Sequence, residues 1–230
     1  MVHESLDYDE AEHTFIEARH ELSTAKRRDV SRRLMLLTVA LILILAAIVG
    51  SIAFFIVFLV QTLSAFKWTT TDEYWHRGEY LNAFLVTLIF TTALALVAAS
   101  LTLYAPQSAG SGIPHVKSYL NGNKLIGILR PRTLVAKVIG ISCCVAIGLP
   151  VGREGPMVHA AACAASITAK AVAYCLRGKI GREHGGFNND YHRRNFVSMG
   201  AAAGVAAAFR APIGGILFSL EEVRNLPAPP

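Results

Sequence analysis

Charged residues are scarce in this 230-residue sequence, at 17% of positions against about a quarter in an ordinary soluble domain. They are missing altogether from the 30 residues between Leu34 and Leu63 and from the 25 residues between Tyr80 and Tyr104. A soluble core helix of such length would carry charge on its wet face. Each stretch exceeds the roughly 20 residues that a helix needs to cross a bilayer. We therefore predict an integral membrane protein of the all-α class, in which both stretches are transmembrane helices.

Cysteine is also scarce, with four residues, and their spacing does not resemble a metal site. We expect them to be small buried hydrophobic residues. The sequence shows no nucleophile–base pair and no phosphate loop, and the Gly-x-Gly at 110–112 lacks the strand that precedes a nucleotide fingerprint. We expect no enzyme activity, no metal and no cofactor.

The net charge of +6 does not indicate nucleic-acid binding, because its positive clusters flank apolar runs. Basic residues between Lys26 and Arg33 directly precede the first span, where cytoplasmic Lys and Arg are expected. The positive-inside rule then places the amino terminus in the cytoplasm and the loop from Ser64 to Glu79 on the other side. The polar tail 1–33 is either a helix outside the membrane or a disordered segment.

After Tyr104 the charge-free runs become short, and none reaches a full membrane crossing. They are residues 138–152, 155–169, 196–209 and 211–220. Short apolar helices broken by Gly and Pro are typical of discontinuous membrane helices whose ends meet an ion. The alternative is a soluble domain that follows two anchoring helices. The GxxxG spacing of Gly200 and Gly204 favours close helix packing in lipid, although this motif is weak by itself.

The segment Ala109–Pro114 predicts a helix start. Its glycines permit unusual backbone angles, and Pro114 suits a first helical turn. Free N–H groups, with the Ser111 hydroxyl as a further donor, would form an anion site. The alternative is a plain glycine-rich turn with a helix cap.

The segment Gly152–Pro156 predicts a second helix start, with Glu154 between two uncharged stretches. A charged group within the membrane is costly and is usually functional. A carboxylate that blocks an anion path when ionised and retreats when protonated would be a gate that senses pH. The alternative is an Arg153–Glu154 pair at the membrane interface.

The segment Phe209–Glu222 predicts a third helix start, and this helix closes with Glu221 and Glu222. Acids at a carboxyl end oppose the helix dipole. The pair therefore suggests proton handling, and the alternative is a solvated helix end.

Together and in this order, these motifs resemble the CLC family of voltage-gated chloride channels and chloride/proton exchangers. The matching segments are GSGIP at 110–114, GREGP at 152–156 and GAAAGVAAAFRAPIGGILFSLEE at 200–222. The resemblance implies the first half of the CLC inverted-repeat fold, with short, tilted and broken helices. It divides the chain into a cytoplasmic tail at 1–33, a transmembrane region at 34–222 and a carboxy-terminal tail at 223–230.

The resemblance also implies roles for individual residues. Ser111 would coordinate chloride and favour it over nitrate, Glu154 would be the gate, and Glu222 would pass protons to the cytoplasm. The backbone amides that would complete this half of the anion path are those of Gly112, Ile113, Arg153, Glu154 and Gly155. Family channels typically have valine at the position of Glu222, so the resemblance favours exchange over passive conduction.

Features at 119–122 and 187–196 are similar to the intracellular exchangers of plants and of endolysosomal membranes. We expect His115 and His159 to be structural, and a role in pH sensing is the lesser alternative. Family members continue with a second inverted repeat and dimerise, so we expect a homodimer only for a full-length form. We expect this chain alone to transport poorly or not at all. Two alternatives remain open: a channel without proton coupling, and a non-transporting partner of a longer relative.

Overall fold

The computed structural model describes residues 3–4, 24–176 and 190–224, which form seven α-helices, a 3-10 turn and a two-residue strand pairing. The all-α prediction is confirmed. In the pairing, β1 (His3–Glu4) lies antiparallel to β2 (Asn123–Lys124). The expectations for the amino-terminal segment 5–23, for residues 177–189 and for the tail after residue 224 lie outside the described residues.

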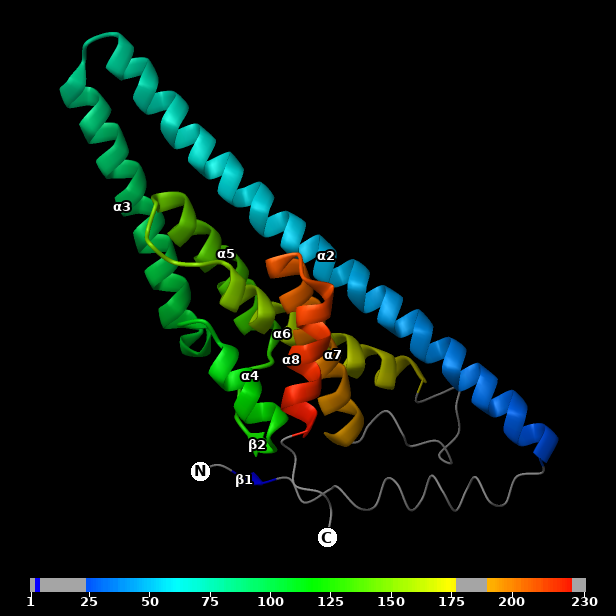
Figure 1. Cartoon of the computed structure of the whole chain (residues 1–230). Coiled ribbons are helices and arrows are strands. Elements are labelled where there is room, and N and C mark those ends of the chain that lie inside the picture. The colour runs from blue at the N-terminus through cyan, green and yellow to red at the C-terminus, as the bar shows by residue number, and fades with distance from the viewer. Residues whose placement is uncertain (1–2, 5–23, 177–189, 225–230) are drawn as a thin grey trace.

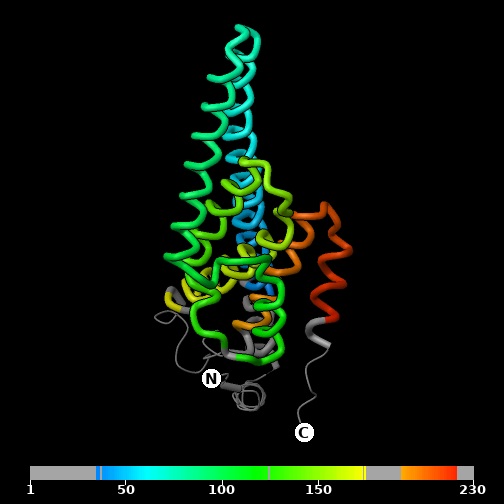
Figure 2. The backbone as a smooth tube through the Cα atoms, turned by 90° about the vertical axis from the view of Figure 1, so that its left-hand side faces the viewer, coloured from blue at the N-terminus to red at the C-terminus, as the bar shows by residue number. Residues whose placement is uncertain are grey.

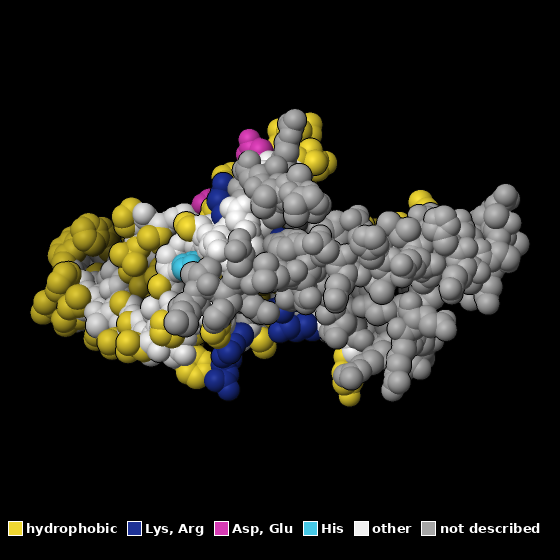
Figure 3. All heavy atoms as spheres, turned by 90° about the horizontal axis from the view of Figure 1, so that it is seen from below, with side chains coloured by type: hydrophobic (Ala, Val, Ile, Leu, Met, Phe, Trp, Pro, Cys, Tyr) yellow, Lys and Arg dark blue, Asp and Glu magenta, His cyan; other side chains and the backbone are white. Residues whose placement is uncertain are grey.

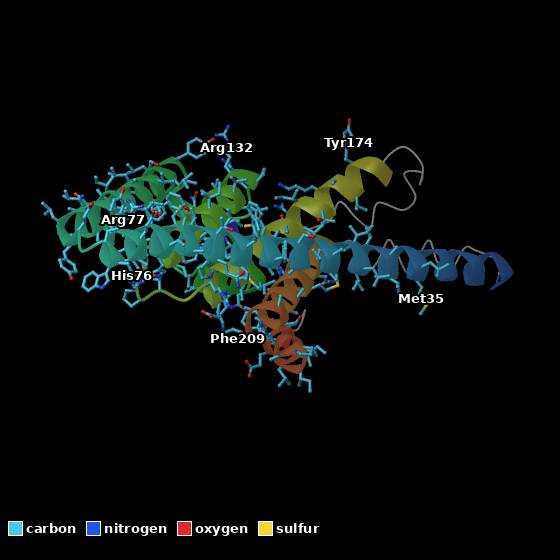
Figure 4. The ribbon with its side chains drawn as sticks, turned by 90° about the horizontal axis from the view of Figure 1, so that it is seen from above. Met35, His76, Arg77, Arg132, Tyr174 and Phe209 are labelled. Carbon is cyan, nitrogen blue, oxygen red and sulfur yellow. The ribbon has the colours of Figure 1, made fainter. Side chains whose placement is uncertain are left out.

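Two long helices form a hairpin that projects beyond the rest of the molecule (Figures 1 and 2). Helix α2 spans Thr24–His76 and, at 53 residues, is about 80 Å long. Helix α3 spans Tyr80–Tyr104. Seen from above, His76 and Arg77 lie at the hairpin tip and Met35 lies toward the other end of α2 (Figure 4).

The predicted loop from Ser64 to Glu79 is wrong, because α2 continues through most of it. No glycine or proline interrupts the segment before the turn at Gly78, whose φ is +79°. Arg77 pairs with Glu73 one turn earlier at 2.5 Å, which supports the last turn of the helix. Charge marked the end of the apolar run, but it did not end the helix.

Both hairpin helices are apolar and largely exposed. Only 22% of the most apolar window of α2 and 6% of that of α3 are buried, and both helices are long enough to cross a membrane. Hydrophobic side chains cover the hairpin end of the face seen from below (Figure 3). A soluble protein would bury such surfaces, so their exposure fits helices that face lipid.

Five further helices follow along the chain. They are α4 (Ile113–Leu120), α5 (Pro131–Ile147), α6 (Glu154–Leu176), α7 (Asp190–Phe209) and α8 (Pro212–Arg224). Helices α5, α6 and α7 pack against the hairpin, whereas α4 packs on α6 and α7, and α8 packs on α7. Helix α5 lies between α2 and α3, and α6 packs along α7 (Figure 1). Helices α6 and α7 have 23 and 20 residues and are longer than the charge-free runs within them. Polar residues at their ends continue the helices beyond the charge-free runs.

Small residues let α6 and α7 approach closely, as the GxxxG spacing predicts. A Cβ on Gly200 would overlap the Cβ of Ala165 and lie 2.8 Å from the carbonyl oxygen of Ala161. A Cβ on Gly204 would lie 2.8 Å from the Cβ of Ala161 and 2.9 Å from the Cα of Val158. These neighbours are methyl groups and backbone atoms, which cannot swing aside.

We expect Gly200→Ala to lower the free energy of unfolding by about 1–3 kcal/mol, because the added methyl group overpacks the α6–α7 contact. Gly50→Ala is the matched control, since a Cβ there meets nothing within 4 Å. Alanine is the better helix former, so this control should be neutral or stabilising. Thermal unfolding of the purified protein in detergent checks both variants, and equal melting temperatures would contradict the close packing.

Candidate functional site

The Ser111 loop, residues 108–112, joins the 3-10 turn η1 (Pro106–Ser108) to α4. Gly110 and Gly112 adopt left-handed φ values of +68° and +78°, and the Gly112 carbonyl accepts the first hydrogen bond of α4 from Val116 N–H, at 3.0 Å. The predicted helix start is confirmed. Ser111 is exposed and lies two residues before α4 begins, where the first N–H groups of the helix lack intrahelical acceptors.

The second helix start is also confirmed, since α6 begins at Glu154. The Arg153 carbonyl accepts from Met157 N–H at 3.1 Å, which makes Arg153 the residue that begins the helical hydrogen-bond pattern. The half-buried Glu154 side chain folds back over Gly152, where any Cβ would overlap its carboxylate oxygen. Glycine at this position therefore leaves room for the carboxylate.

The first two motifs meet in space although they are far apart in the sequence. A Cβ on Gly155 would lie 2.8 Å from the Ser111 Cβ and 3.6 Å from the Ile113 Cδ1. One turn further along α6, His159 lies against Gly112, where a Cβ would overlap its ring. The first two turns of α6 thus pack directly against the Ser111 loop, so the amino ends of α4 and α6 converge.

The His159 side chain packs behind the contact between α6 and the Ser111 loop. Its side chain is fully buried, and its Nε2 atom lies 3.3 Å from the Ile128 carbonyl oxygen. The His115 ring stacks on it with a centroid separation of 6.3 Å. Neither Nδ1 atom has a hydrogen-bond partner among the described residues. This packing agrees with the structural role expected for both histidines.

Lys137 belongs to the same region but was missed by the sequence reasoning. It lies on α5, is 3% exposed, and its ammonium group donates to the carbonyls of Ser108 and Gly110, both at 2.8 Å. The available signal was a single cation directly before the charge-free run 138–152, since an isolated charge in an apolar helix is often functional.

The third helix start is confirmed at Pro212, after Arg210 in a left-handed conformation with φ of +54°. Helix α8 packs closely on α7, because a Cβ on Gly215 would overlap the Ala202 carbonyl oxygen. It also reaches α4, where the Lys117 ammonium lies 5.5 Å from the centre of the Phe218 ring. The Glu222 side chain lies outside the described residues, and Glu221 is exposed.

A cavity of about 210 Å³ lies toward the other end of α4 and shares no lining residue with the Ser111 loop or the Glu154 motif. Several cations line it, among them Arg130, Lys170 and Arg193. The cavity is therefore separate from the place where the amino ends of α4 and α6 converge.

The chain is similar to known proteins over most of its length. A family model described as "Voltage gated chloride channel" matches residues 93–227. Chloride channel protein CLC-c of Arabidopsis thaliana is 40% identical over 225 residues, which are 96% of this chain and 28% of that protein. H(+)/Cl(-) exchange transporter 7 of Homo sapiens is 38% identical over 228 residues, again 96% of this chain and 28% of that protein.

A solved structure described as the crystal structure of a eukaryotic CLC transporter has a TM-score of 0.63 and 26% sequence identity. The match covers 84% of this chain and 35% of that one. The chain thus spans less than a third of the length of these curated relatives.

Proposed function

Because the chain belongs to the voltage-gated chloride channel family, we propose that it takes part in chloride transport across a membrane in exchange for protons. The names of its relatives, which include H(+)/Cl(-) exchange transporters and chloride channel proteins, support this proposal. This chain would supply one half of the pathway, in keeping with the share of those relatives that it matches.

The observation that carries the proposal is the contact between Gly155 and Ser111 at the converging ends of α4 and α6. The Ser111 hydroxyl and the amides of Gly112, Ile113, Arg153, Glu154 and Gly155 would bind chloride there. Amino ends of helices carry a partial positive charge and free N–H groups, and both favour an anion. Two such ends that meet at one place are a stronger attraction for chloride than either end alone.

Glu154 would be the gate and the first proton carrier. It is the first residue of α6 and directly precedes Gly155 in the sequence, and Gly155 contacts Ser111. An ionised carboxylate there competes with chloride for the same donors, and protonation removes the competing charge. Glu222 on α8 would carry the proton onward to the cytoplasmic side.

A chloride channel without proton coupling is the second candidate. It is favoured by the name of the Arabidopsis relative, a chloride channel protein at 40% identity. Chloride current without proton movement would distinguish it from the exchanger.

The membrane placement completes the proposal. The hairpin tip carries Asp72, Glu73 and Glu79 against Arg77, whereas the basic cluster before Leu34 lies at the other end of α2. The positive-inside rule then places the amino end in the cytoplasm and the tip on the opposite side. We place the protein in an intracellular membrane as a homodimer in its full-length form, with lipid, chloride and protons as its partners.

We expect Ser111→Ala to weaken chloride binding about tenfold or more, since a hydrogen bond to a charged group is worth about 1.5–3 kcal/mol. Ser100→Ala is the matched control, because Ser100 is an exposed serine on α3 whose hydroxyl donates to the Val97 carbonyl oxygen of the same helix. Titration calorimetry with chloride in detergent measures binding. Chloride efflux from vesicles that hold the chain, alone and with the remaining length of CLC-c, measures transport. Absence of both binding and efflux in the unmodified protein would refute the function.

A further inference from the structure

Lys67 is a buried cation on the hairpin helix α2, just beyond the charge-free run that ends at Leu63. It is 6% exposed, and its ammonium group donates to the carbonyl oxygens of Ala146 at 3.1 Å and Ile147 at 3.0 Å. The ammonium also lies 4.8 Å from the centre of the Trp68 ring. Among the residues that the structure describes, no carboxylate forms an ion pair with it. The charge is therefore directed at the carboxyl end of α5.

The last four carbonyls of α5 all have hydrogen-bond partners, although such carbonyls lack donors within their own helix. The helix ends at Gly148, which has a left-handed φ of +99° and whose N–H bonds to the Val145 carbonyl at 3.0 Å. The Leu149 N–H bonds to the Cys144 carbonyl at 3.2 Å, and the two bonds form a Schellman cap. This cap leaves the last two carbonyls of the helix, which are the two that Lys67 binds.

The carboxyl end of α5 needs this cation because the helix is packed between α2 and α3. A backbone carbonyl at membrane depth must find its donor within the protein, since lipid offers none. A positive charge at this end also complements the partial negative charge of the helix dipole. Lys67 thus stabilises the end of α5 by two hydrogen bonds and by its charge.

The α5–α6 loop, residues 148–153, connects the capped end to the start of α6. Pro150 fixes one φ angle in it, and across this proline the Val151 N–H bonds to the Leu149 carbonyl at 2.7 Å. A loop this short, with a tight turn at its centre, has little conformational freedom. The position of the α5 end therefore determines where α6 begins.

The same loop carries the residue on which the Glu154 carboxylate lies. This carboxylate folds back over Gly152, where a Cβ would overlap it. The next residue of α6, Gly155, contacts Ser111. A shift of the α5–α6 loop would therefore move the carboxylate relative to the Ser111 loop.

We propose that Lys67 is a positioning residue for the gate. Its hydrogen bonds to the end of α5 hold the α5–α6 loop, and this loop holds the Glu154 carboxylate where it competes with chloride. The gating role of Glu154 rests on the proposed function, whereas the cap on α5 is independent of it.

The test compares Lys67→Met, which removes charge and donors, with Lys67→Arg, which keeps both. Thr71→Val is the matched control, because Thr71 lies one turn further along α2 and its hydroxyl contacts the Thr87 hydroxyl on α3 at 2.9 Å. This control weakens the hairpin without removing the α5 cap. Gly148→Ala disturbs the cap from the other side, since a Cβ disfavours its left-handed φ. Size-exclusion chromatography and circular dichroism first establish that each variant folds.

Hydrogen exchange on the full chain in detergent tests the cap. The peptide that covers residues 144–154 contains the end of α5 and the α5–α6 loop. We expect exchange in this peptide to be at least about tenfold faster in Lys67→Met, because two carbonyls lose their donor and the last turn opens more often. Gly148→Ala should have a similar effect, while Lys67→Arg and Thr71→Val keep the rate near that of the unmodified chain.

Calorimetry with chloride at neutral and at acidic pH tests the gate. An ionised carboxylate competes with chloride and a protonated one does not, so the unmodified chain should bind chloride more tightly at acidic pH. In Lys67→Met the ratio of the two dissociation constants should shrink at least about threefold, because the carboxylate is no longer held among the same donors. A general loss of stability would raise both dissociation constants alike and leave their ratio unchanged.

Other charged groups near this site are His115, His159 and Lys137 around the Ser111 loop, and Arg153 beside the gate. Glu154→Gln in the same titration therefore gives the share of the pH dependence that belongs to the carboxylate. Lys67→Met should remove part of this share, and Lys67→Arg should restore most of it.

Normal exchange in both Lys67→Met and Gly148→Ala would overturn the cap, and faster exchange with an unchanged ratio of dissociation constants would overturn the link to the gate. Equal effects of Thr71→Val and Lys67→Met would also overturn the proposal, since a weakened hairpin would then explain both. If Lys67→Met does not fold, Gly148→Ala and Lys67→Arg decide by the same two measurements. Absence of chloride binding in the unmodified chain would refute the proposed function, and hydrogen exchange would still decide whether Lys67 holds the loop.

Discussion

Chloride-driven proton uptake is expected to fall to the level of empty vesicles in Glu154→Ala, while chloride continues to move. Glu154 begins α6, and its carboxylate folds back over Gly152. The next residue along the helix, Gly155, contacts Ser111. Without the carboxyl group no proton can be carried at this position, and no negative side chain competes with the anion. The measurement is extravesicular pH under a chloride gradient, with the chain assembled with the remaining length of CLC-c.

Glu222→Ala is expected to lose proton uptake in the same way, because it would break the relay on its cytoplasmic side. Glu221→Ala is the matched control: the same charge is removed one position earlier on α8, where Glu221 is exposed. Proton coupling that survives both Glu154→Ala and Glu222→Ala would show that the assigned roles are wrong. Chloride flux without proton movement in the unmodified protein would support the channel instead.

Gly112→Ala is expected to abolish measurable chloride binding and to destabilise the fold. A left-handed φ costs a residue with a Cβ about 1–2 kcal/mol, and Gly112 has φ of +78°. The new methyl group would also overlap the fully buried His159 ring, and overpacking costs about 1–3 kcal/mol more. The loop must then shift at the residue that follows Ser111. Chloride calorimetry and thermal unfolding measure the two effects.

Gly78→Ala provides the control for backbone strain alone. Its φ is +79°, and a Cβ there meets nothing within 4 Å. In this variant the free energy of unfolding should fall only by the cost of the left-handed conformation, and the chloride affinity should not change. The double variant Gly112→Ala with His159→Ala should regain part of the lost binding, because the overlapping ring is gone. If Gly112→Ala behaved like Gly78→Ala, the contact with His159 would have no importance for the site.

The helix starts at Ile113, Glu154 and Pro212 were predictable because local residues decide them. Gly112 supplies the left-handed turn before α4, and proline lies in the first turn of all three helices, so the signal lies within a few neighbouring residues. The end of α2 was predicted wrongly for a related reason. A change from apolar to charged residues marks a membrane boundary, whereas the helix continues until a residue breaks it, here at Gly78.

Lys137 and His159 could not be assigned in the same way. Their partners lie 27–31 residues away in the chain, at the Ser111 loop and at Ile128. No local pattern tells which carbonyl a buried ammonium reaches, since that depends on how α5 and α6 pack around the loop. An isolated lysine or histidine in an apolar helix indicates only that some partner must exist.

The sequence by itself determined the apolar spans, the family resemblance and the positions where helices begin, because charge, glycine and proline act over short distances along the chain. Only the tertiary structure decided that Gly155 touches Ser111, that His159 fills the space behind Gly112 and that Lys137 holds the loop. These contacts arise where helices distant in sequence pack together, and they depend on side-chain volume and on the hydrogen bonds that burial requires.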